Sequence, residues 1–245
     1  MRVLLLGGTA EARELAARLH ASVDVISSLA GRVPDPALPV GEVRVGGFGG
    51  ADGLRRWLRD NGVDAVVDAT HPFAATMTAN AATACADLGV PHLVLHRPPW
   101  DSDGATVVGS DTAAAETVAA KGYSRVFLTT GRSGAAAFAG SDAWFLIRVV
   151  TAPDPADLPH HHELLFSRGP YRYDDEHALM AGRAVEVLVT KNSGGEHTRA
   201  KLDAARALGV AVVMIDRPPL PPGVQVVDSV DAAQRWVLSR GSAAG

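Results

Sequence analysis

The sequence predicts an α/β fold of two doubly wound, parallel-sheet domains related by internal duplication, and two observations carry this prediction. The first is a repeat: Leu88-Gly89-Val90 followed by Arg97-Pro98-Pro99 returns 120 residues later (208 − 88) as Leu208-Gly209-Val210 followed by Arg217-Pro218-Pro219. The second is that short apolar runs alternate with helical periodicity through both halves. Two similar halves, each long enough for its own core, explain both observations.

The first half opens with the apolar run Val3–Leu6, which is typical of a strand buried on both faces. Residues 11–20 follow with apolar side chains on one helical face. Pro34, Pro36 and Pro39 exclude a helix in the next loop. The pattern predicts strands at 3–6, 23–27, 63–68 and 92–95, and helices at 11–20, 52–60 and 74–88.

The second half repeats this order. It predicts strands at 125–129, 144–149, 164–167, 185–190 and 211–215, and helices at 135–139, 174–180 and 196–208. Residues 105–120 and 225–238 each read as a strand plus a helix after an Arg-Pro-Pro corner, and either could complete the sheet of the other half. We expect domains at 1–100 and 123–222, with a connecting segment at 101–122 and a terminal strand and helix at 223–245.

Composition excludes several classes of protein. A net charge of −4, without clustered Lys and Arg, argues against nucleic-acid binding. The run Val3–Leu6 is too short for a signal peptide, and no run reaches about 18 apolar residues, so we expect a cytoplasmic protein without a membrane partner. The single Cys85 excludes an internal disulfide and is expected to be buried in a helix. The sequence leaves the oligomeric state open.

Ligands of open parallel sheets bind where strands end at their carboxyl edge. In the second half, one strand ends in Lys191-Asn192-Ser193-Gly194-Gly195, and Thr198 lies in the first turn of the next expected helix. Glycines and free N–H groups at a helix start favour a diphosphate, with a simple helix cap and a surface lysine as the alternative. The first strand of this half ends in a second candidate loop, made of Thr130, Gly131, Arg132 and Ser133.

The end of the second strand in such folds contacts the adenosine ribose, where an acid favours NAD and an Arg favours NADP. Arg148 holds this place in the second half. Its guanidinium suits a phosphate monoester, although a salt-bridged edge residue is the alternative. The first half has Ser28 and Arg32 there, again without an acid.

We call residues 191–195 the lysine loop. In the first half, its place is taken by Asp68-Ala69-Thr70-His71-Pro72-Phe73-Ala74. His71 stands in place of Lys191 and Phe73 in place of Ser193, which favours a flatter, partly apolar ligand. His71 could deliver a proton near neutral pH, and a histidine hydrogen-bonded within its loop is the alternative. The run His160-His161-His162 is expected in an exposed loop and not at a metal site, because three consecutive histidines converge poorly on one ion.

Several motifs occur together and in order, and with them the chain resembles the precorrin-6A reductase family of cobalamin biosynthesis. The motifs are Leu6-Gly7-Gly8-Thr9-Ala10-Glu11, Ser28-Leu29-Ala30-Gly31-Arg32, Gly46-Gly47-Phe48-Gly49-Gly50, Asp68-Ala69-Thr70-His71-Pro72-Phe73-Ala74, Arg97-Pro98-Pro99-Trp100, Thr130-Gly131-Arg132 and Lys191-Asn192-Ser193-Gly194-Gly195.

The resemblance implies two Rossmann-like domains with the active site in the cleft between them, and NADPH-dependent reduction of precorrin-6A, or its cobalt-loaded equivalent, to precorrin-6B. It implies that the C-terminal domain holds NADPH and that the N-terminal domain faces the tetrapyrrole. We expect His71 to be catalytic and five residues to contact this substrate: Thr9, Ser28, Arg32, Thr70 and Phe73.

Two other functions fit a pair of such domains. One is transfer of a sugar from a nucleotide donor, with residues 191–195 on the donor diphosphate. The other is a nucleotide sensor without chemistry. Both stay open at this point.

Overall fold

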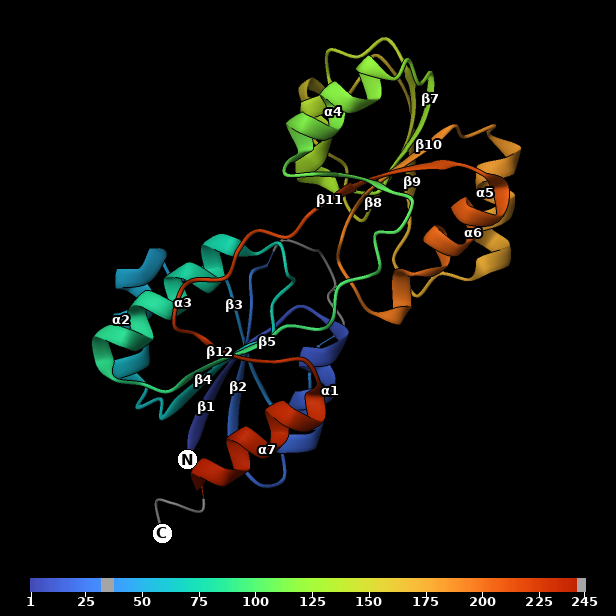
Figure 1. Cartoon of the computed structure of the whole chain (residues 1–245). Coiled ribbons are helices and arrows are strands. Elements are labelled where there is room, and N and C mark those ends of the chain that lie inside the picture. Colours follow the sequence, from blue (N-terminus) through green and yellow to red (C-terminus); the bar gives the residue numbers. More distant parts are fainter. Residues whose placement is uncertain (32–37, 242–245) are drawn as a thin grey trace. The chain divides into compact units, whose positions relative to one another are not determined.

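The computed structural model of the chain describes residues 1–31 and 38–241, and it divides into two compact units (Figure 1). Unit 1 consists of Met1–Pro98 and Pro218–Gly245, and unit 2 is Pro99–Arg217. Both passages of the chain between the units therefore fall within the two Arg-Pro-Pro motifs. Residues 101–122 lie with unit 2, and the terminal strand and helix lie with unit 1.

Unit 1 is built on a six-stranded parallel sheet with the order β3-β2-β1-β4-β5-β12. Helices α1 and α7 cover one face of it, and α2 and α3 cover the other. The strands are β1 (Arg2–Leu6), β2 (Asp24–Leu29), β3 (Glu42–Val45), β4 (Ala65–Asp68), β5 (His92–Leu95) and β12 (Gln225–Val227), and the helices are α1 (Ala10–Leu19), α2 (Gly50–Asp60), α3 (Ala75–Leu88) and α7 (Val230–Gly241).

Unit 2 has the corresponding strand order, β9-β8-β7-β10-β11-β6, but its outer strand β6 comes first in the chain, whereas β12 comes last in unit 1. Its strands are β6 (Thr106–Val108), β7 (Arg125–Leu128), β8 (Trp144–Val149), β9 (His161–Phe166), β10 (Val187–Lys191) and β11 (Ala211–Ile215). Its helices are α4 (Asp111–Ala120), α5 (Tyr173–Gly182) and α6 (Ala200–Leu208), with 3₁₀ helices η1 (Arg132–Phe138), η2 (Pro155–Asp157) and η3 (Glu196–Thr198).

Each sheet takes its last strand from the segment that follows the other half. After β5 the chain leaves the first sheet, and β6 pairs with β11. After β11 it returns, and β12 pairs with β5. The exchange continues into the core, because Val230, Ala233 and Trp236 of α7 pack with α1 and the first sheet. The fold class expected from the sequence is confirmed, and the two outer segments are exchanged.

Three local expectations were wrong. The strand β3 was not expected, because its alternating Glu-Val-Arg-Val sequence lies at the sheet edge and lacks an apolar run. Residues 132–138 form the 3₁₀ helix η1 instead of an α-helix. The strand β9 begins at His161, so two of the three consecutive histidines lie on an edge strand and not in a loop.

Two further properties concern the whole described chain. No helix within residues 1–31 and 38–241 has the length and apolar character needed to cross a bilayer. Over the same ranges, no group of three His, Cys, Asp or Glu side chains is arranged to hold a metal ion.

Candidate functional sites at the carboxyl edges of the two sheets

The order of strands reverses between β1 and β4 in unit 1, and such a reversal opens a crevice for ligands at the carboxyl edge of a sheet. Thr9 follows β1 there and caps α1 by accepting the N–H of Ala12 at 3.1 Å. The same hydroxyl donates to the carbonyl oxygen of Ala69 at 2.8 Å. Thr9 therefore ties the loop after β1 to the loop after β4, although it was predicted to contact substrate.

One small pocket lies at this reversal, and we call it the β1–β4 pocket. Thr9, Glu11, Thr70 and Arg97 contribute to its wall. Glu11 and Arg97 form an ion pair across 2.8 Å with side chains that are 23% and 16% exposed. The pair joins the start of α1 to the segment after β5, so three loops of unit 1 converge at one point.

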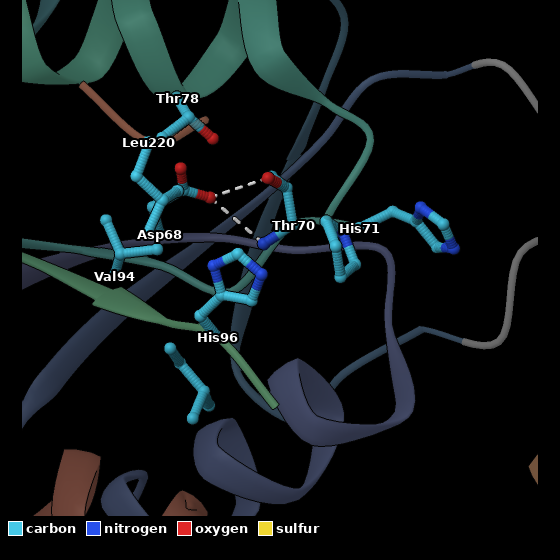
Figure 2. Close-up of a pocket in the computed structure, with 9 residues that line it drawn as sticks. Asp68, Thr70, His71, Thr78, Val94, His96 and Leu220 are labelled. Carbon is cyan, nitrogen blue, oxygen red and sulfur yellow. Dashed lines mark hydrogen bonds between the residues drawn. The ribbon is translucent and has the colours of Figure 1, made fainter. Parts of the chain in front are cut away.

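A second pocket lies between the ends of β4 and β5, and we call it the β4–β5 pocket (Figure 2). Asp68 is buried in its wall and accepts hydrogen bonds from both the N–H and the hydroxyl of Thr70, at 3.0 and 2.6 Å, through Oδ1. His96 and Thr78 also line it. The predicted residue Thr70 is therefore at a pocket, with its hydroxyl directed to Asp68.

The charge of Asp68 is felt on the strand and helix around it. Burial raises the pKa of the Cys85 thiol to about 12, and the negative charge of Asp68 adds to this effect. Burial lowers the pKa of His92, and the charge of Asp68 partly offsets the change. The β4–β5 pocket thus has a buried acceptor at its base, and Cys85 is the buried helix cysteine that the sequence predicted.

His71 is exposed at the rim of this pocket. Its Nδ1 accepts the N–H of Phe73 at 3.3 Å, and the two rings lie 5.8 Å apart in a tilted arrangement. In Figure 2 its ring points away from Asp68. This is the hydrogen-bonded loop histidine that the sequence left as the alternative, and Nε2 then carries the hydrogen of the neutral ring.

Ser28 lies at the end of β2 and is held by a residue that sequence patterns did not single out. Arg44, on β3, donates to Ser28 Oγ and to the carbonyl oxygen of Gly46, both at 2.9 Å. Its guanidinium also lies over the ring of Phe48, 3.8 Å from the centroid, and burial lowers its pKa. Arg32, the other residue predicted beside Ser28, lies outside the described residues.

The corresponding reversal in unit 2 lies between β7 and β10. There the two loops predicted to hold a cofactor meet, because Lys191 Nζ donates to the carbonyl oxygen of Thr130 at 3.0 Å. Lys191 also lies 3.7 Å from a carboxylate oxygen of Asp111, at the start of α4. Part of the lysine charge is thus balanced within the protein, so backbone N–H groups carry more of any anion binding.

The geometry of both loops permits a close ligand. Gly131, Gly194 and Gly195 have φ angles of 78°, 67° and 76°, which side chains disfavour. The buried hydroxyl oxygen of Thr130 has no hydrogen-bond partner among the described residues. Arg132 and Ser133 are exposed beside it. An orphaned donor and flexible glycines are the features that a phosphate-bearing cofactor would use.

Trp100, which is far from the lysine loop in the sequence, fixes this loop by direct hydrogen bonds. The Asn192 side chain accepts the Trp100 N–H at 2.8 Å and donates to the Trp100 carbonyl at 3.2 Å, so its amide is committed to the protein. The carbonyl oxygen of Thr198, at the end of η3, accepts a hydrogen bond from the Lys201 ammonium at 3.1 Å. Asn192 therefore positions the loop, and Ser193, Gly194 and Gly195 are the residues it presents.

Arg148 is placed differently from the predicted phosphate ligand. Its guanidinium forms two hydrogen bonds to the Glu176 carboxylate, at 2.9 and 2.6 Å, and both side chains are buried. The rings of Tyr171 and Phe127 cover it at 4.0 and 4.8 Å from their centroids. The structure thus favours the salt-bridged alternative, since a buried and paired guanidinium presents little surface to a phosphate.

The sequence did not indicate Arg44, His96 or Trp100 as site residues. The one signal for Arg44 and His96 is position, because each stands at the carboxyl end of a strand or directly after it. Trp100 stands next to the repeated Arg-Pro-Pro motif and has no counterpart in the second copy, where Leu220 follows.

Comparison with known proteins gives a consistent answer. The family described as Precorrin-6x reductase CbiJ/CobK matches residues 2–238. The precorrin-6A reductase of Mycobacterium tuberculosis is 67% identical over 236 residues, which cover 96% of this chain and 97% of that protein. The precorrin-6A reductase of Rhodococcus erythropolis is 56% identical over 241 residues, with 96% and 97% covered.

A solved structure agrees with the sequence relatives. The structure described as CobK precorrin-6A reductase superimposes with a TM-score of 0.91 at 36% identity and covers 98% of this chain and 97% of its own. A match over the full fold supports the two exchanged sheets. On the motifs, the geometry of the two carboxyl edges and these matches, the chain belongs to the Precorrin-6x reductase CbiJ/CobK family.

Proposed function

We propose that this protein reduces precorrin-6A to precorrin-6B in cobalamin biosynthesis and uses NADPH as the reductant. The match to precorrin-6A reductases over nearly the whole chain is the observation that carries the proposal. When bound, NADPH supplies a hydride, and the protein supplies binding, orientation and a proton. Unit 2 holds the cofactor in this proposal, and unit 1 holds the tetrapyrrole.

The cofactor site is the meeting point of the two unit 2 loops. Lys191, Ser193, Gly194 and Gly195 would receive the diphosphate, with Thr130, Gly131 and Ser133 opposite them. Asn192 acts by holding this loop in place, and Thr198 lies in the turn that follows it. Such a site relies on fixed backbone dipoles, which stabilise an anion without reorganising.

Arg132 is the residue we propose for the 2′-phosphate of NADPH. It is exposed and follows a glycine with positive φ, and its guanidinium forms no hydrogen bond or ion pair with the described residues. Arg148 was the first candidate from the sequence, but its charge is already matched by Glu176. A guanidinium without such a partner can bind a phosphate monoester through two parallel hydrogen bonds.

The substrate site is the carboxyl edge of unit 1. Phe73 donates its N–H to Nδ1 of the exposed His71 ring, and we propose that this imidazole polarises the conjugated ring of the substrate by hydrogen bonding. Thr9 and Ser28 shape the edge through Ala69 and Arg44. If His71→Ala leaves single-turnover hydride transfer unchanged across pH, this role of His71 is wrong.

The substrate proposed is the cobalt-free macrocycle. The relatives named precorrin-6A reductase reach 67% and 56% identity, whereas the cobalt-precorrin-6A reductase of Priestia megaterium is 32% identical over 238 residues. Paired assays with the cobalt-free and cobalt-loaded substrates test this choice. A higher kcat/KM for the cobalt-loaded ring would contradict it.

The decisive experiment follows NADPH absorbance and tetrapyrrole absorbance together. Reductase activity predicts oxidation of one NADPH for each ring that changes its spectrum. NADPH binding without turnover would support the sensor function, and consumption of a sugar nucleotide would support the transferase. NADH in place of NADPH is the matched cofactor control.

A further inference from the structure

The reduction proposed above needs a proton as well as a hydride, and the β4–β5 pocket contains a group suited to supply it. Asp68 is 1% exposed, and its Oδ2 atom is buried without a hydrogen-bond partner among the described residues. Its other oxygen, Oδ1, is fully used by Thr70. A buried carboxylate oxygen without a donor is costly, so an unmatched Oδ2 in a pocket wall points to a partner that arrives or moves there.

The strand register places a histidine on the same face as Asp68. Asp68 pairs with Val94 across β4 and β5, and side chains two residues apart on a strand share a face. His96 is therefore on the Asp68 side, one step beyond the end of β5. Both residues line the β4–β5 pocket, and Figure 2 shows the His96 ring on the Asp68 side of the loop that carries His71.

The His96 backbone is held firmly. Its N–H donates to the carbonyl oxygen of Val227, on the exchanged strand β12, at 2.8 Å. A fixed backbone with a half-buried ring is the arrangement in which a neighbouring carboxylate can set the orientation of an imidazole. Asp68 in turn is fixed by the turn it forms with Thr70.

We propose that Asp68 and His96 form a carboxylate–imidazole pair, in which Asp68 orients the ring and His96 gives a proton to the bound tetrapyrrole. This inference rests on the function proposed above. The ring carbon gains the proton from an imidazolium nitrogen of His96, a C–H bond forms as the N–H bond breaks, and the neutral imidazole regains a proton from water. With the hydride from NADPH, the ring gains two electrons and two hydrogens, and the cofactor is released as NADP⁺.

Other titratable groups surround the pair. His71 lies on the loop after β4, His92 at the start of β5 and Cys85 on α3, and the Glu11–Arg97 ion pair contributes to the neighbouring pocket. Among the first three, the two buried groups feel the charge of Asp68. A pH effect must therefore be assigned to His96 by observing its own ring.

The first test observes the His96 ring by NMR in the unliganded full chain. Asp68→Asn keeps the oxygen that accepts from Thr70 but removes the negative charge. We expect the midpoint of the His96 titration to fall by about one pH unit, the smaller end of the effect of a nearby charge. Asp64→Asn is the matched control, because Asp64 is exposed at the other end of β4 and accepts the Arg2 N–H at 2.7 Å. An unchanged His96 titration in Asp68→Asn would overturn the pair.

The second test measures turnover. We expect Asp68→Asn and His96→Gln each to lower kcat about 100-fold, the lower range for a positioned acid, with little change in the KM for NADPH. The double variant should lose no more than His96→Gln alone, and the pH profile of kcat should flatten in both single variants. Wild-type kcat in either variant would overturn the inference, since a merely structural Asp68 keeps its turn as asparagine.

The two proposals can fail separately. If the wild-type protein does not oxidise NADPH with the tetrapyrrole, the proposed function fails, and the NMR titration still decides whether the pair exists. If the wild-type protein turns over and His96→Gln matches it, only the proton donor is wrong. His20→Gln, an exposed histidine after α1, controls for the loss of an imidazole.

Discussion

Trp100 donates its indole N–H to the carbonyl oxygen of Gly195 at 2.8 Å, which links the segment after the first Arg-Pro-Pro motif to the end of the lysine loop. Its backbone also exchanges two hydrogen bonds with the Asn192 side chain. Three contacts from one residue thus hold both ends of the loop that we propose for the cofactor diphosphate. The arrangement is fixed before any ligand arrives, which lowers the entropy lost on binding.

Replacing the indole tests this relationship. Trp100→Phe removes the N–H donor to Gly195 and keeps an aromatic ring. One hydrogen bond contributes about 0.5–1.5 kcal/mol, so the Kd for NADPH should rise about 2- to 10-fold. Titration of NADPH fluorescence measures the change. Trp57→Phe, in α2 of unit 1, is the control, and an equal loss in both variants would contradict a specific role of Trp100.

The buried Arg148–Glu176 pair predicts a loss of stability and not of cofactor choice. Arg148→Ala leaves a buried carboxylate unmatched, and breaking such a pair costs about 3–5 kcal/mol of the free energy of unfolding. Replacing both partners, as in Arg148→Met with Glu176→Leu, should recover most of that loss. Urea unfolding measures both. The partly exposed pair Arg183–Glu163 is the control, and Arg183→Ala should cost at most about 1 kcal/mol.

The preference for NADPH over NADH distinguishes the roles of Arg132 and Arg148. We expect Arg132→Ala to weaken NADPH binding about 10- to 150-fold while NADH binding stays unchanged, because one charged hydrogen bond to phosphate contributes about 1.5–3 kcal/mol. The folded Arg148→Met/Glu176→Leu variant should keep the wild-type preference. The ratio of kcat/KM for the two cofactors is the measurement. If that double variant lost the preference for NADPH over NADH, Arg148 would be the residue that binds the 2′-phosphate.

The exchanged C-terminal segment predicts an uneven response to truncation. A chain ending at Pro222 lacks β12 and α7, so unit 1 loses an outer strand and the packing of Val230, Ala233 and Trp236. We expect fast hydrogen exchange throughout unit 1, with protection retained in the continuous unit 2. Mass spectrometry of exchange reads each unit, and a chain ending at Gly241 is the control. Equal exchange in both units would show that the exchanged segment does not stabilise unit 1.

The thiol of Cys85 is expected to be unreactive in the native protein. Its pKa, raised to about 12 chiefly by burial, keeps the thiol protonated at pH 8, and the protonated form does not react with alkylating reagents. Iodoacetamide should therefore leave the native protein unlabelled at pH 8 and label Cys85 only after the protein is unfolded in urea. Ala86→Cys in a Cys85→Ala background places a thiol on the exposed side of α3 as the control. Rapid labelling of native Cys85 would contradict the burial.

The elements that the sequence predicted best are those that local pattern determines. The strands β5, β8 and β11 have the predicted bounds, because each is a short apolar run between turn signals. β3 escaped prediction because an edge strand needs no continuous apolar run. The helix α6 begins four residues later than predicted. The residues before it form the 3₁₀ helix η3, which sequence patterns do not distinguish from the first turn of an α-helix.

The role of a site residue could not be predicted from the sequence where its interaction partner lies on another helix or strand. The lysine loop and the Thr130 loop could be predicted one by one from glycines after strands, and the sheet order brings them together. The fate of Arg148 depends on Glu176, a residue in α5 whose side chain meets it only in the folded protein. Trp100 and the backbone of His96 are likewise held by hydrogen bonds to residues 92 and 131 positions away along the chain (192 − 100 and 227 − 96).

The exchange of outer strands also sets an order in which the two units can be finished as the chain is synthesised. Every residue of unit 2 has been added to the chain by Arg217, whereas unit 1 still lacks the residues from Pro218 onward. The first sheet therefore keeps its β5 edge uncovered until β12 and α7 emerge. In this protein the half that is translated first is the half that is completed last.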